Sequence, residues 1–195
     1  MTTTDPLHAT IRGHGPAVLF VHGLDDDGTI WDRAIDLLQA DHRCVSVDLP
    51  GHGSSPVPSD PEAYERESVL DALDTVIADL DSPVTLVGHS LGGYLGLAHV
   101  LTRPGDLAAL VLVATGPGFR DPDARERWNE RVAANAPDYG ISETAARIAF
   151  HIDSMVIDRL TEIEVPVALV VGSRDKGFLG ANDYFEKKLP HAVRT

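Results

Sequence analysis

Short apolar runs alternate with amphipathic segments along most of this chain. The runs are continuous rather than alternating, which is typical of strands that are buried on both faces of a parallel sheet. Between them, apolar residues recur three and four positions apart, as on one face of a helix. We therefore predict strands at 7–12, 17–21, 44–47, 84–87, 108–114 and 165–171, and helices at 31–38, 69–80, 94–100 and 180–189. This order predicts an α/β fold with a doubly wound, mostly parallel sheet in three α/β/α layers.

The stretch from Gly116 to Glu164 breaks this alternation. Asp121 and Pro122 suit the cap and first residue of a polar helix, and a second helix is predicted at 142–151. We expect an insertion at about 117–160 to form a short helical lid over the strand ends. The chain shows no linker and no repeat, so residues 1–195 are predicted to form a single domain.

The most informative stretch is the G-x-S-x-G sequence Gly88-His89-Ser90-Leu91-Gly92, placed between a predicted strand and a predicted helix. In a nucleophile elbow of this type, a sharp turn holds the serine hydroxyl at the carboxyl edge of the sheet, beside the positive end of the helix. The alternative is an ordinary glycine-rich turn that happens to contain a serine. The flanking strand and helix favour the catalytic interpretation of Ser90.

Charge and composition restrict the partners. The formal net charge of −14 argues against binding nucleic acid or an anionic membrane surface. Residues 1–6 are polar and lack the apolar core of a signal peptide, and no run reaches transmembrane length, so we predict a cytoplasmic protein. The nine histidines are scattered and the single cysteine has no second cysteine near it, so the sequence predicts no metal site.

Four segments, taken together, resemble the α/β-hydrolase fold superfamily in its serine hydrolase branch. The resemblance covers the chain from about Val18 to its end and is weakest in the lid. The four segments are His22-Gly23-Leu24, the stretch 48–53, the elbow around Ser90, and the stretch 165–175, which ends in Asp175.

The resemblance implies a role for each matching residue. Ser90 would attack a carbonyl carbon to give an acyl-enzyme, and the backbone N–H groups of Leu24 and Leu91 would form the oxyanion hole. Asp175 would orient the catalytic imidazole, with Asp121 as the second candidate for that acid. The implied substrate is a small carboxylic ester or related acyl compound, and no cofactor is needed. The alternative is a non-catalytic module that binds a small ligand in the same pocket.

The histidine of such a triad is not recognisable. The family order is Ser, Asp, His, and His191 is the one histidine that follows Asp175. His191 precedes any returning strand, so we expect it at the wrong edge of the sheet, on the surface. His151, at the inner edge of the lid, is more easily explained by packing. The chain itself is therefore expected to be weakly active or inactive.

The same observation predicts a gap in the sheet. We expect the chain to stop before the last strand, the catalytic histidine and the last helix, with 193–195 as the start of that strand. The strand at 165–171 would then be an unpaired, strongly apolar edge. Such an edge favours pairing with a second copy, so a homodimer through it is predicted.

Overall fold

Seven strands form one sheet in the computed structural model, which describes residues 7–80, 83–189 and 191–195. The spatial order is β1-β3-β2-β4-β5-β6-β7, and β1 is antiparallel to β3 while the other neighbours are parallel. The α/β-hydrolase-type sheet predicted from the sequence is confirmed. The strands are β1 Ala9–Arg12, β2 Ala17–Val21, β3 Arg43–Val47, β4 Val84–His89, β5 Leu107–Val113, β6 Val167–Val170 and β7 Ala192–Arg194.

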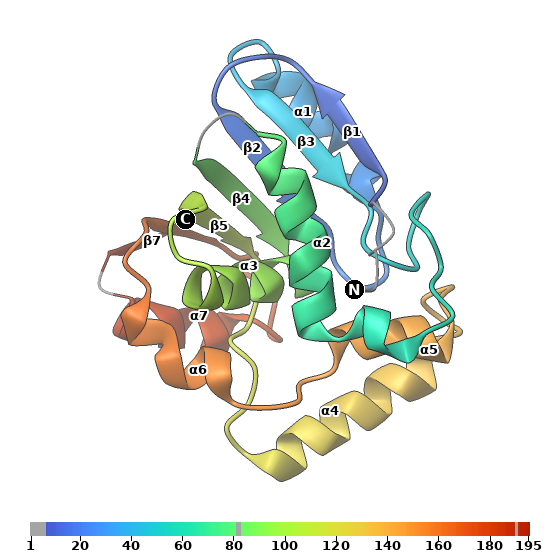
Figure 1. Ribbon diagram of the computed structural model, residues 1–195. Coiled ribbons are helices and arrows are strands. Elements are labelled where there is room, and N and C mark those ends of the chain that lie inside the picture. Colours follow the sequence, from blue (N-terminus) through green and yellow to red (C-terminus); the bar gives the residue numbers. More distant parts are fainter. Residues whose placement is uncertain (1–6, 81–82, 190) are drawn as a thin grey trace.

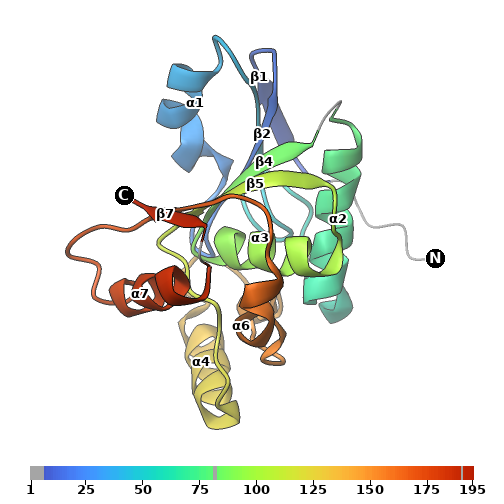
Figure 2. The ribbon, with the colours of Figure 1, turned by 90° about the vertical axis from the view of Figure 1, so that its left-hand side faces the viewer.

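Helices lie on both sides of this sheet. Viewed along the sheet, α1 lies on one side, and α2, α3 and α6 lie on the other (Figure 2). Within the described residues, no helix is both long enough and apolar enough to cross a bilayer. The α-helices are α1 Asp32–Leu38, α2 Arg66–Ala78, α3 Leu91–Thr102, α4 Pro122–Asn135, α5 Glu143–Ala146, α6 Met155–Arg159 and α7 Leu179–Lys188. Four short 3-10 helices are η1 Gly28–Trp31, η2 Pro61–Tyr64, η3 Arg147–Ala149 and η4 Leu160–Glu162.

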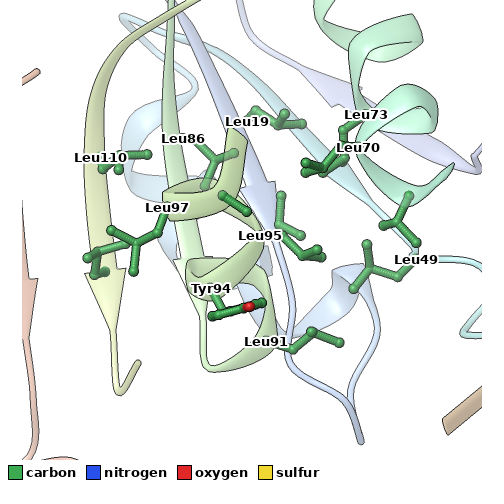
Figure 3. Close-up of a cluster of buried hydrophobic side chains, with 14 of the residues drawn as sticks. Leu19, Leu49, Leu70, Leu73, Leu86, Leu91, Tyr94, Leu95, Leu97 and Leu110 are labelled. Carbon is green, nitrogen blue, oxygen red and sulfur yellow. The ribbon is translucent and has the colours of Figure 1, made fainter. Parts of the chain in front are cut away.

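The two faces of the sheet differ in how well they are covered. Toward α2 and α3, side chains such as Leu19, Leu86 and Leu110 are almost completely buried (Figure 3). On the opposite face, a smaller cluster packs under η1 and α1, and the strand residues Val87 and Val113 on that face stay partly exposed. The larger core therefore holds α3, and the elbow at its start, against the sheet.

The lid begins as the sequence predicts. Asp121 caps α4 by accepting a hydrogen bond from the N–H of Asp123 at 3.1 Å. In Figure 1, α4 lies below the sheet and runs from its cap back toward α5. The predicted helix at 142–151 is broken, because α5 ends at Ala146 and the chain continues as η3. Further on, α6 packs on α3.

The predicted absence of the last strand requires a correction. After α7, the chain turns at Ala192, whose N–H donates to the Leu189 carbonyl at 2.9 Å, and β7 then pairs with β6 in parallel register. The N–H of Thr195 continues this ladder to Leu169 at 2.9 Å. The seven residues that follow α7 therefore include the start of this strand. The edge of the sheet is β7, not β6 as predicted.

Candidate active site

Ser90 has a strained backbone at the junction of β4 and α3. Its φ of 48° and ψ of −108° lie in a region that non-glycine residues rarely adopt, at a cost of about 1–3 kcal/mol. Backbone hydrogen bonds hold it in place: its N–H donates to the Val113 carbonyl at 2.9 Å, and its carbonyl accepts from Tyr94 at 3.1 Å. The side chain is only partly buried. Strain of this kind is typical of a nucleophile elbow.

Glycines make this turn possible because the chain packs against itself without room for side chains. A Cβ on Gly88 would collide with the backbone of Gly92, and one on Gly92 would collide with the carbonyl of Val21. A Cβ on Gly93 would strike the hydroxyl of Thr115. These contacts explain the need for glycine, since the three glycines let the start of α3 approach β4, β2 and the residue Thr115 beyond β5.

The loop after β2 is fixed by two buried histidines. The ring of His22 donates from Nδ1 to the Gly23 carbonyl at 2.6 Å and accepts at Nε2 from the Leu49 N–H at 2.9 Å. Burial lowers the pKa of His22, in keeping with this neutral form. His52 reaches the same loop, with Nε2 2.6 Å from the carbonyl of Leu24. Both rings therefore position the loop's backbone.

The two predicted oxyanion donors lie on this loop and on the first residue of α3. The N–H of Gly92 donates to the His22 carbonyl at 3.1 Å, which joins the helix start to the loop. In the part of the chain that the structure describes, the N–H groups of Leu24 and Leu91 make no hydrogen bond. Both groups therefore have the capacity to bind an incoming oxygen, and their role stays a prediction.

A pair that the sequence did not indicate lies next to this loop. Nδ1 of His89 is 3.2 Å from the Oδ2 of Asp26, and the two side chains remain 32% and 26% exposed. The contact joins residues 63 positions apart. No local spacing rule reports such a contact.

The predicted acids both act as caps in this structure. The Oδ1 of Asp175 accepts from the N–H groups of Gly177 and Phe178 at 3.1 and 3.2 Å, in the turn that leads to α7. Asp121 caps α4. Across residues 7–80, 83–189 and 191–195, no imidazole is hydrogen-bonded to Asp175. Its role as the acid of a triad remains a prediction.

His191 lies where the sequence predicts. It is exposed and immediately precedes β7, whose first residue pairs with Val167 at the start of β6. Ser90 follows the opposite, carboxyl end of β4. His191 is therefore at the amino edge of the sheet, away from the elbow.

Comparison with known proteins identifies the family. Residues 18–192 match the model of the alpha/beta hydrolase family. The chain belongs to this family. This chain is 36% identical over 117 residues to a pimeloyl-[acyl-carrier protein] methyl ester esterase of Nitrosomonas europaea, a match that covers 58% of this chain and 42% of that protein. It is 26% identical over 237 aligned positions to a putative 2-succinyl-6-hydroxy-2,4-cyclohexadiene-1-carboxylate synthase of Bacillus subtilis, covering 97% of this chain and 86% of that protein.

Solved structures of low sequence identity show the same fold. The structure of MenH from S. aureus superposes with a TM-score of 0.85 at 18% identity, covering 100% of this chain and 89% of that one. An esterase from Exiguobacterium antarcticum superposes with a TM-score of 0.82 at 18% identity, covering 97% and 85%. The sequence matches to the pimeloyl esterases span less than half the length of those proteins.

In this chain, His151 belongs to an aromatic cluster. Its ring meets Tyr94 edge-on at 4.6 Å and Phe119 edge-on at 5.2 Å, and lies 5.7 Å from the ring of Trp128. Burial is the main cause that lowers its pKa to about 4, with Arg66 as a second cause. His151 is thus neutral and its Nδ1 is buried without a partner. This supports the packing role over a catalytic one.

An ion pair joins the lid to α2. Arg66, at the start of α2, donates two hydrogen bonds to the carboxylate of Asp153 at 2.9 and 2.8 Å. Asp153 also caps the turn into α6 through the N–H of Met155. The Arg66 hydrogen bonds are the main cause that lowers the pKa of Asp153. The geometry is the bidentate arrangement that gives arginine–carboxylate pairs their strength.

One cluster has the composition of a metal site. Ligand atoms of Asp74, His99 and Asp106 lie within 4.8 Å of one another. However, Nε2 of His99 is already 2.7 Å from Asp74, and Arg103 binds the second oxygen of the same carboxylate. The side chains of Asp74, His99 and Arg103 thus already form a network that joins α2 to the end of α3.

Proposed function

We propose that this chain is a serine hydrolase of small carboxylic esters that forms an acyl-enzyme on Ser90. The observation that carries the proposal is the strained conformation of Ser90 between β4 and α3, with unbonded N–H groups of Leu24 and Leu91 on the neighbouring segments. A turn that only connected a strand to a helix would have no need of a non-glycine residue at φ 48°.

In the proposed reaction, Oγ of Ser90 bonds to the carbonyl carbon of the ester. The N–H groups of Leu24 and Leu91 stabilise the negative oxygen that this step creates. The carbon–oxygen bond to the alcohol then breaks, and the alcohol leaves with the proton lost by Oγ. Water cleaves the resulting acyl-enzyme, which releases the acid and restores the serine.

Asp175 would orient the base in this mechanism, but no imidazole is hydrogen-bonded to it within the described residues. Loss of one triad member typically lowers the rate by several orders of magnitude. Slow turnover is therefore expected of this chain. Ester chemistry is supported by the names of its relatives, which include methyl ester esterases.

The test is hydrolysis of p-nitrophenyl butyrate, measured as release of nitrophenolate, together with mass spectrometry of the acyl adduct. Ser90→Ala should abolish both the adduct and the turnover that exceeds the background. Ser59→Ala, which changes an exposed loop serine, is the matched control and should have no effect. An adduct that persists in Ser90→Ala would refute the assignment. Reversible binding of the ester without any adduct on the wild type would favour the ligand-binding alternative.

A further inference from the structure

His89 and Asp26 contact the candidate oxyanion loop at Gly23. We infer that this pair is a positioning device. It holds the N–H of Leu24 at a fixed position relative to the N–H of Leu91, so that both can donate to the same oxygen. The inference rests on the proposed function, because it assigns these two donors to one substrate oxygen. His89 and Asp26 act on the loop and not on the reacting atoms.

The contact with the loop is close. A Cβ added to Gly23 would lie 2.9 Å from Nδ1 of His89 and 3.3 Å from Oδ2 of Asp26, so both groups lie directly against this glycine. On the α3 side, the Gly92 N–H donates to the His22 carbonyl. The His22–Gly23 segment therefore contacts both the start of the helix and the imidazole–carboxylate pair, which together form a clamp on it.

The position of the pair in the chain explains why it matters. Asp26 follows Leu24 by two residues, and His89 precedes Leu91 by two residues. The hydrogen bond between them therefore joins the two segments that carry the donors. Displacing a reacting or stabilising group by about 1 Å lowers an enzymatic rate by up to about a hundredfold, so a link of this kind has a measurable effect.

Partial exposure separates this pair from the structural histidines of the same loop. His22 and His52 are buried and bond to the backbone, whereas about a third of the His89 side chain and a quarter of the Asp26 side chain remain accessible. Because His89 directly precedes Ser90 in the chain, this partly exposed pair lies beside the elbow.

The experiment uses a p-nitrophenyl alkylphosphonate, which forms a P–O bond with Oγ of Ser90 and releases nitrophenolate. Asp26→Ala and His89→Ala should each lower the maximal labelling rate by about tenfold while the half-saturating probe concentration stays the same, because a donor is misplaced and no probe contact is lost. The double variant should be no slower than either single variant. His89→Asn keeps a donor near the position of Nδ1 and should label close to the wild-type rate. Asp25→Ala removes an adjacent exposed carboxylate and is the matched control.

Different outcomes would refute the positioning role of the pair and the proposed function. Three results would each refute the positioning role of the pair. These are unchanged labelling in both alanine variants, strictly multiplicative losses of rate in the double variant, and an effect on probe affinity alone. A His89→Asn variant that labels as slowly as His89→Ala would also refute this role. Failure of the wild type to label at Ser90 would instead refute the proposed function. The amide NMR signals of Gly23 and Leu24 then still test the clamp, since Asp26→Ala should shift and broaden them, and unchanged signals would refute it.

Discussion

His151 should make the stability of this protein sensitive to mild acid. The folded chain holds its ring neutral, with the pKa lowered from 6.5 to about 4. Above pH 6.5 the histidine is neutral in both the folded and the unfolded chain, so it has no effect on the free energy of unfolding. As the pH falls from 6.5 toward 4, the unfolded chain binds a proton that the folded chain does not, and stability is lost.

The size of the loss follows from the two pKa values. At pH 5.0 the difference corresponds to about 2 kcal/mol of unfolding free energy, and it approaches about 3 kcal/mol near pH 4. Replacing His151 by phenylalanine removes the group that binds this proton. A phenyl ring also retains the edge-on contacts with Tyr94 and Phe119. The fall in stability between pH 7.5 and pH 5.0 should therefore be about 2 kcal/mol smaller in His151→Phe than in the wild type.

Urea unfolding at the two pH values, followed by tryptophan fluorescence, measures this difference. The comparison is made within each protein, so any change in packing that is independent of pH cancels. His14→Gln removes an exposed histidine and should leave the wild-type pH dependence unchanged. An equal loss of stability on acidification in His151→Phe and in the wild type would refute the reasoning. Direct NMR titration of the His151 ring gives the same answer independently.

Three further predictions concern the lid, the elbow and the sheet edge. Arg66→Met should lower the free energy of unfolding by about 1–3 kcal/mol in urea titrations, because it leaves the Asp153 carboxylate without its two charged hydrogen bonds; no loss would show that the pair is immaterial to stability. Gly93→Ala should destabilise by about 1–3 kcal/mol through collision with the Thr115 hydroxyl, and Thr115→Ala should recover part of this in the double variant, whereas purely additive losses would contradict the collision. Val193→Lys, on the edge strand β7, should weaken any self-association seen by size-exclusion chromatography with light scattering, and dimers that persist unchanged would exclude this edge as the interface.

The succession of strands and helices could be predicted from the sequence because each buried strand is a continuous apolar run. Deviations have local causes. The last predicted run, 165–171, yields only Val167–Val170 as β6, since Pro166 has no N–H to donate to the ladder. The helix predicted at 142–151 stops early, and the chain then turns His151 into the ring cluster of Tyr94 and Phe119. Helical spacing alone could not show that those rings lie next to His151 in the fold.

The contacts that shape the candidate site were not predictable in this way. The pairs Asp26–His89 and Arg66–Asp153 join residues 63 and 87 positions apart, and neither has a local pattern in the sequence. The G-x-S-x-G pattern does predict a strained serine, because it describes a turn with a known backbone path. The pattern does not predict which residues from other segments pack against that turn.

The strained conformation of Ser90 is stabilised with the help of a second strained residue, which directly follows the adjacent strand. Ala114, with φ 47°, follows β5 as Ser90 follows β4, and its N–H donates to the Val170 carbonyl of β6 at 2.9 Å. The unusual backbone at Ala114 turns Thr115 toward the elbow, where its buried hydroxyl lies 3.2 Å from the Ser90 carbonyl. The same hydroxyl is what a side chain on Gly93 would strike. Because β4, β5 and β6 all contribute hydrogen bonds, three paired strands stabilise the geometry of the elbow. The five residues of the G-x-S-x-G motif alone would not maintain it.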